Sequence, residues 1–279
     1  MDTHAYASTL DVLVNLPHGG EETAALQAAT FLCKRLDARL DALCIVPPMT
    51  GNVSVPEITT QQLDEIQLRR QQAEHNGTWY DGLLRQHTLE GRWQVTQGDP
   101  VQTLCHVTAG YDLLVLERDD RRGEAPLGFG TVSRAIFGCR APVLVVPAKT
   151  RAVQPGRRIL LAWNGSRESL LAARDALPIL RHAESVTVLE GTAEQPWVSH
   201  ELPALQLTDW LRRRGITANV RAFDPGNDAG AAILRAAHDT EADLIVMGAW
   251  GRSRVSEMLL GGATRHLFAE SDVPMLVAH

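Results

Sequence analysis

The residues of this chain whose types and spacing could do chemistry are three glycines near its end. Gly248, Gly251 and Gly261 follow the apolar run Asp243–Met247, which is typical of a buried parallel strand, and precede a predicted helix over Arg265–Glu270. Glycines at the carboxyl end of a strand let backbone N–H groups approach an anion where a Cβ atom would intrude. The start of a helix adds further N–H groups and a partial positive charge. The pattern indicates a phosphate cradle and therefore a nucleotide. Simple turn glycines are the alternative, because the spacing fits neither G-x-G-x-x-G nor the P-loop.

No other group of residues in the sequence has the arrangement of a catalytic or metal site. The ten histidines include no pair at i, i+4 spacing, and His106, His182 and His238 stand singly on predicted helices. Ser166 lacks the glycine two positions before it that a nucleophile elbow requires. We therefore predict no catalytic residue and no metal ligand. A nucleotidyl transferase or an ATP-activating synthetase would need a base, nucleophile or metal cluster that the sequence does not supply, while slow ATP hydrolysis stays open.

Composition and charge narrow the class of protein. The 279 residues are 44% hydrophobic and 22% charged, and this length suits one large domain or two of typical size. A net charge of −6 argues against a general nucleic-acid surface, which needs a clustered basic face. No apolar run approaches a membrane span, the first residues lack a secretory signal, and the four cysteines are scattered. We expect a cytoplasmic protein that binds neither nucleic acid nor membrane.

The chain contains an internal repeat. Asp11–Val14 and Asp112–Leu116 in the first half resemble Arg158–Leu161 and Asp243–Met247 in the second. The repeated unit is too long for a solenoid. We predict two tandem domains, residues 1–148 and 157–279, with an insertion around residues 47–90 of the first that includes a polar helix over Leu63–Leu84.

Short apolar runs alternate with helical ones. In the second half the predicted strands are Ile159–Ala162, Ser185–Leu189, Thr217–Ala222, Asp243–Met247 and Pro274–Ala278, and the predicted helices are Glu168–Leu180, Leu202–Arg214, Ala231–Asp239 and Thr264–Ala269. Ser166 and, in the first half, Asp99 are predicted helix N-caps. This alternation predicts a parallel α/β sheet covered on both faces, with ligands bound at the carboxyl ends of strands where the strand order reverses.

The second half resembles the universal stress protein family. The resemblance rests on the segment Ile159–Ser166 and on the Gly-x2-Gly-x9-Gly pattern that begins at Gly248. It extends over residues 8–279 as a tandem member of the family and is strong in the second half. It implies the fold class α/β, with two tandem doubly wound five-stranded parallel-sheet domains of the nucleotide-binding, Rossmann-like type.

The resemblance also implies a nucleotide site in the second half. The nucleotide-binding residues carried over to this sequence are Ala162, Trp163, Asn164 and Gly191 for the nucleoside, and Met247, Gly248, Gly251, Arg252, Gly261, Gly262 and Ala263 towards the phosphates. The implied ligand is ATP or another adenine nucleotide, with Mg²⁺ as a candidate companion.

Two residues of the second half, Asn164 and Gly262, depart from the family's pattern. Asp usually stands at the position of Asn164, and Ser or Thr at that of Gly262, so a hydroxyl that would donate to phosphate is missing. A hydrogen bond to a charged group is worth about 1.5–3 kcal/mol, or about 10- to 150-fold in affinity. Thr264 offers a substitute hydroxyl, whereas Trp250 is bulky enough to fill or cover the phosphate space.

The first half lacks the features of this site. Glu117–Asp120 stands where the first two glycines would be, and Pro17 aligns with Asn164. Carboxylates repel a triphosphate and proline removes a backbone donor, so we expect no nucleotide there. By resemblance, family dimers pair through their last strands. We therefore expect Val143–Val146 and Met275–Ala278 to pair within the chain as an intramolecular pseudo-dimer, which would cover two sheet edges.

Two classes of function follow. The first is a stress-response protein that binds adenine nucleotide in its second domain and acts through an unknown protein partner. We expect this protein to be a homo-oligomer. The alternative is a nucleotide-free dimerisation or scaffold protein in which both domains keep only the fold.

Overall fold

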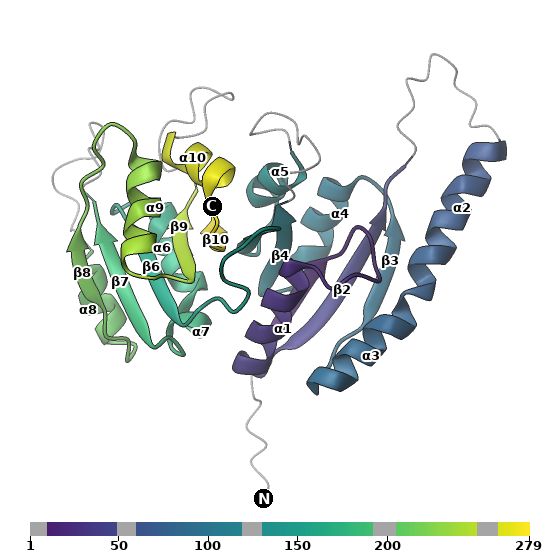
Figure 1. Ribbon diagram of the computed structural model, residues 1–279, viewed down its shortest axis with the longest axis horizontal. Coiled ribbons are helices and arrows are strands. Elements are labelled where there is room, and N and C mark those ends of the chain that lie inside the picture. Colours follow the sequence, from purple (N-terminus) through teal and green to yellow (C-terminus); the bar gives the residue numbers. More distant parts are fainter. Residues whose placement is uncertain (1–9, 49–59, 119–129, 192–204, 250–261) are drawn as a thin grey trace, which may run out of the picture.

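The computed structural model describes residues 10–48, 60–118, 130–191, 205–249 and 262–279 (Figure 1). None of the helices in these ranges is long and apolar enough to cross a membrane.

Strands and helices alternate along both halves of the chain. The first half contains β1 (Asp11–Asn15), α1 (Ala24–Leu36), β2 (Arg39–Val46), α2 (Thr60–His75), α3 (Gly77–His87), β3 (Trp93–Gln97), α4 (Pro100–Val107), the short 3₁₀ helix η1 (Thr108–Gly110), β4 (Leu113–Arg118), α5 (Thr131–Gly138) and β5 (Val143–Pro147). The second half contains β6 (Arg158–Trp163), α6 (Arg167–Asp175), α7 (Leu177–Leu180), β7 (Ser185–Glu190), α8 (Leu207–Arg212), β8 (Asn219–Ala222), α9 (Ala229–Asp239), β9 (Leu244–Gly248), α10 (Gly262–Glu270) and β10 (Met275–Ala278).

The ten strands of the described residues form one sheet. Its order is β3-β2-β1-β4-β5-β10-β9-β6-β7-β8. Neighbouring strands within each half are parallel, and the halves join where β5 and β10 pair antiparallel, with Leu144 opposite Leu276. The α/β fold and the predicted pairing of the last strands within one chain are both confirmed. The two five-stranded parallel sheets are continuous rather than separate.

Apolar layers cover both faces of this sheet. α1, α3, α6, α7 and α8 pack on one face, and α4, α5, α9 and α10 pack on the other. Successive residues of β1 alternate between the layers, since Val12 and Val14 belong to the first and Leu13 to the second. Strands buried on both faces explain why the sequence shows continuous apolar runs rather than alternation.

A repeated aspartate fixes the start of each half. An Asp112 carboxylate oxygen accepts a hydrogen bond from the backbone N–H of Asp11 at 2.9 Å. The carboxylate of Asp243 accepts from the N–H groups of Gly156, Arg157 and Arg158 at 2.7, 3.0 and 3.0 Å. Burial raises the pKa of Asp243, while these backbone bonds oppose the rise. The aspartate in the sequence repeat therefore ties the fourth strand of each half to the beginning of its first strand.

The structure corrects several predicted boundaries. The helix predicted over Glu168–Leu180 is divided into α6 and α7, because Pro178 has no N–H with which to continue the hydrogen-bond ladder. The polar helix predicted over Leu63–Leu84 is also two helices, α2 and α3. At that break the indole Nε1 of Trp93 donates to the carbonyl of Ala73. The helix predicted to start at Leu202 starts at Leu207 in the described residues, and the strand predicted from Thr217 starts at Asn219.

The two predicted N-caps are confirmed. The hydroxyl of Ser166 accepts a hydrogen bond from the N–H of Ser169 at 3.1 Å, and the carboxylate of Asp99 accepts from the N–H of Gln102 at 2.8 Å.

Candidate functional site

The strand order of the second half reverses between β6 and β9. These strands are parallel neighbours, and Ala162 of β6 lies opposite Met247 of β9. Their last residues, Trp163 and Gly248, therefore end at the same edge of the sheet. In open parallel sheets the crevice at such a reversal is where ligands bind.

The turn after β6 is held by its own side chains. The side-chain oxygen of Asn164 accepts a hydrogen bond from the N–H of Ser166 at 3.1 Å, and Gly165 between them has a φ of +75°. The Ser166 hydroxyl then caps α6. Because the oxygen of Asn164 serves this turn, its amide NH₂ is the group left for a ligand, whereas the sequence suggested both an acceptor and a donor.

Two of the other residues expected to contact the nucleoside, Trp163 and Gly191, bond to each other. The indole of Trp163 is buried, at 6% exposed, in the apolar layer beneath α6 and α7. The carbonyl of Trp163 accepts from the N–H of Gly191 at 2.8 Å. The Trp163 indole therefore packs in the core, and this carbonyl and N–H are already paired.

Gly248 brings β9 close to the start of α6. A Cβ atom at this position would lie 2.4 Å from the carbonyl carbon of Glu168 and 2.5 Å from the nitrogen of Ser169. Both are backbone atoms, so the glycine is required for this packing. The space that a side chain would need is thus taken by the backbone at the start of α6.

The first residues of α10 complete the described part of the site. Gly262 is exposed, and a Cβ atom built on it would meet nothing within 4 Å. Ala263 is half-buried against the apolar layer that also contains Met247. Trp250, Gly251, Arg252 and Gly261 lie outside the described residues.

The first half has a measurable cavity at the equivalent strand ends. It has a volume of about 600 Å³, and its lining includes Asn15, Glu21, Thr23, Glu117 and Thr131. Glu117 is the fifth residue of β4, as Gly248 is of β9. A Glu117 carboxylate oxygen accepts a hydrogen bond from the N–H of Ala25, in the first turn of α1, at 3.1 Å. A protein carboxylate thus occupies the helix start in the first half where the second half has a bare glycine.

The sequence model of the universal stress protein family matches residues 12–147 and again 156–279. The chain belongs to this family. A universal stress protein from Archaeoglobus fulgidus DSM 4304 has a similar structure, with a TM-score of 0.70 at 15% identity, over 96% of this chain and 95% of that one. A Pseudomonas aeruginosa PAO1 protein described as functionally unknown is similar with a TM-score of 0.59 at 15% identity, over 97% and 92% of the two chains. At these identities the likeness concerns the fold. A search of curated proteins gives no match.

Arg118 connects the two universal stress protein halves. It ends β4 and is 8% exposed, and its guanidinium donates to the carbonyls of Phe268 and Ser271, both at 2.8 Å, and of Leu267 at 3.4 Å. These carbonyls belong to the last turn of α10 or follow it, where a cation is favoured by the helix dipole. The sequence identified Arg118 only as part of the segment Glu117–Asp120 that replaces the first two glycines, and the structure shows that its guanidinium binds the other half.

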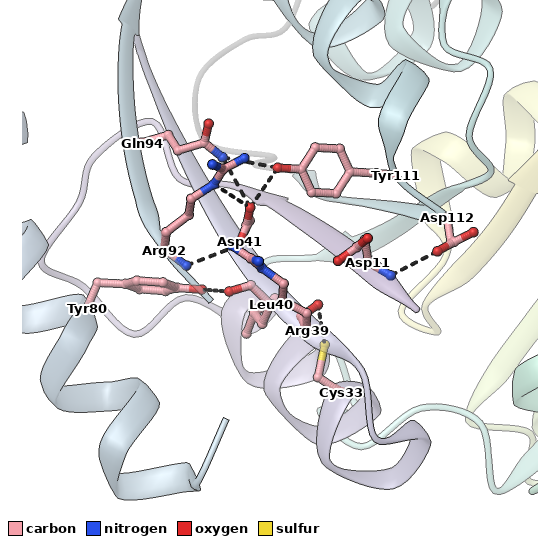
Figure 2. Close-up of polar contacts among 10 residues, drawn as sticks. All are labelled: Asp11, Cys33, Arg39, Leu40, Asp41, Tyr80, Arg92, Gln94, Tyr111 and Asp112. Carbon is pink, nitrogen blue, oxygen red and sulfur yellow. Dashed lines mark hydrogen bonds and ion pairs between the residues drawn. The ribbon is translucent and has the colours of Figure 1, made fainter. Parts of the chain in front are cut away.

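A polar cluster within the described part of this universal stress protein surrounds Asp41 of β2 (Figure 2). Asp41 is 2% exposed, and its carboxylate accepts from Arg39 Nε at 2.9 Å, Arg92 Nε at 2.9 Å and the Tyr111 hydroxyl at 2.8 Å. Asp41 is the third residue of β2, nearer its amino end, whereas the crevices lie at the carboxyl ends. With these donors present, we interpret the cluster as a structural anchor of the first half.

Two residues of the first-half cavity and the contact between halves were missed by sequence reasoning. Asn15 carried a usable signal, because it is a polar residue ending an apolar strand at the position where β6 has Ala162. Glu21 had no such signal. Arg118 could not be recognised as a contact, since its acceptors lie about 150 residues away.

Proposed function

We propose that this universal stress protein binds ATP or another adenine nucleotide, with Mg²⁺ as companion, at the strand ends of its second half and not of its first. The observation that carries the proposal is the contrast at one position of the fold. Gly248 leaves the second-half strand end without a side chain, whereas Glu117 places a carboxylate on the start of α1. An anion is favoured at a helix start whose N–H groups can reach it and disfavoured where a carboxylate is already there.

The proposal includes the glycine loop carried over from the family resemblance. Gly251, Arg252 and Gly261 would approach the phosphates, and Gly262 and Ala263 would present the first N–H groups of α10. Nucleotide occupancy would then alter the surface that a protein partner reads. We therefore propose a stress-response role in the cytoplasm, in which the nucleotide-bound protein acts on an unknown protein partner. We also propose that the chain forms a homo-oligomer.

The test adds the hydroxyl that the family pattern usually has. Gly262→Ser fits sterically because nothing lies within 4 Å of the built Cβ. If phosphate lies there, a charge-assisted hydrogen bond should tighten ATP binding by about 10-fold or more. The matched control is Gly82→Ser in α3, another helical glycine with open space around its Cβ.

The measurement is titration calorimetry of ATP into the full chain, together with the nucleotide released when purified protein is denatured. Binding that is tightened by Gly262→Ser and unchanged by Gly82→Ser supports the proposal. No released nucleotide, and no heat at millimolar ATP in either wild type or Gly262→Ser, would refute it. That result would favour the scaffold alternative, for which the internal pairing of Trp163 with Gly191 is the supporting observation.

A further inference from the structure

The first-half cavity combines an unpaired buried polar atom with acidic and apolar walls. Asn15 lines the cavity and is only 9% exposed. Its side-chain oxygen is buried and has no hydrogen-bond partner among the described residues. A buried acceptor left without a donor costs about 1–3 kcal/mol. This feature therefore indicates a missing hydrogen-bond donor at this place.

The charges around the cavity define the kind of donor. Glu21 and Glu117 line it together with the imidazole of His18, and its described lining contains neither lysine nor arginine. Arg118 follows Glu117 in sequence, but its guanidinium binds the carbonyls of α10. One oxygen of Glu117 accepts from the N–H of Ala25. This carboxylate is thus held in place by the start of α1, and it disfavours an anion while favouring a cation.

Apart from the polar side chains of His18, Thr23 and Thr131, the rest of the lining is apolar. Leu16, Ile45, Leu116 and Val132 are each at most 5% exposed and form the walls, and Pro47 and Pro100 also line the cavity. These surfaces can contact a short hydrocarbon chain but offer a strongly hydrated metal ion nothing. A volume of about 600 Å³ is within the range of small-molecule sites.

We propose that the first-half cavity binds a small organic cation, a protonated aliphatic amine. An ammonium group has three donors and no acceptor. In this site it donates to Asn15 and to the Glu117 carboxylate, while its hydrocarbon chain lies against the apolar walls. The side-chain contrast supports this assignment, because the second half has Ala162 and Gly248 where the first half has Asn15 and Glu117. On this proposal the first half binds a cation and the second half binds an anion, at equivalent positions of the same fold.

The test is titration calorimetry of 1,4-diaminobutane into the full chain at neutral pH and low salt. The neutral analogue 1,4-butanediol has the same length and separates charge recognition from a general affinity for the cavity. We expect the diamine to bind at least about 10-fold more tightly than the diol, the factor for a charge-assisted hydrogen bond.

Three variants place the binding in the cavity. Glu117→Gln keeps an acceptor for the N–H of Ala25 but removes the charge, and it should weaken diamine binding about 10-fold or more. Asn15→Ala installs the second-half residue and should also weaken it. Glu22→Gln removes a neighbouring exposed carboxylate that does not line the cavity, and it should leave binding unchanged.

Several results would overturn the proposal. These are no binding of the diamine at millimolar concentration, equal binding of diamine and diol, or the same loss in Glu117→Gln and Glu22→Gln. If Glu117→Gln does not fold, Glu21→Gln removes the other carboxylate charge of the lining at an exposed residue, and it should also weaken diamine binding. Failure here is distinguishable from failure of the nucleotide proposal, which depends on Gly262 in the other half.

Discussion

Replacing Arg118 by methionine should weaken the connection between the two halves of the protein. Methionine keeps most of the apolar length of the side chain but cannot donate to the carbonyls of Phe268 and Ser271 at 2.8 Å. A buried carbonyl left without a donor costs about 1–3 kcal/mol, so the two together cost about 2–6 kcal/mol. Removing the buried charge returns part of this, and we expect a net loss of about 3 kcal/mol in the free energy of unfolding.

The assay is urea unfolding of the full chain, followed by circular dichroism. With an m value of about 3 kcal/mol per molar, the midpoint should fall by about 1 M. Hydrogen exchange gives a local reading, because the amides of α10 should lose protection before those of the central strands. Arg181→Met is the control, since Arg181 is exposed and its replacement should change stability by less than about 0.5 kcal/mol.

An unfolding free energy for Arg118→Met within about 0.5 kcal/mol of wild type, with unchanged exchange in α10, would refute this reasoning. It would mean that the guanidinium contributes little and that the other contacts between the halves, including the pairing of β5 with β10, are sufficient to hold them together.

Two further predictions test features of the crevice and the packing. Gly248→Ala should destabilise the protein by about 2 kcal/mol in thermal or urea unfolding, because its Cβ would lie 2.4 Å from the Glu168 backbone. Gly262→Ala, with open space around it, should stay within about 0.5 kcal/mol, and equal stability of the two variants would contradict the packing argument. Burial raises the pKa of the Cys139 thiol to about 12, so iodoacetamide at pH 8 should alkylate it at least about 100-fold more slowly in native than in denatured protein. Mass spectrometry of timed samples measures this rate, and equal rates would contradict the raised pKa of the thiol.

Features encoded locally were predictable from the sequence. The apolar strands and the caps at Ser166 and Asp99 depend on residues near one another, or on a pattern that occurs twice. The pairing of β5 with β10 followed from the resemblance to a dimeric family and was confirmed.

Features that depend on distant contacts were not predictable. The helix break near residue 76 involves Trp93 of β3, whose indole N–H donates to the carbonyl of Ala73 in α2. Asp41 is one charged residue within an apolar strand, and nothing near it in sequence indicates that Arg92 and Tyr111 satisfy it. In the candidate site, the sequence identified the glycines but not the commitment of Asn164 to its own turn, because that depends on the backbone geometry at Gly165.

The antiparallel pairing of β5 and β10 within one polypeptide has an evolutionary consequence. In a dimer of identical subunits every substitution is present in both subunits, so both sites must change together. Here each half is encoded separately, so the strand end of one half can lose its glycines while that of the other half keeps them. Arg118 illustrates this freedom, since β9 ends in glycine and Ala249 follows it, leaving no second arginine to repeat the contact. Covalent linkage also makes association independent of protein concentration, so the asymmetric pair remains assembled however scarce the protein is in the cell.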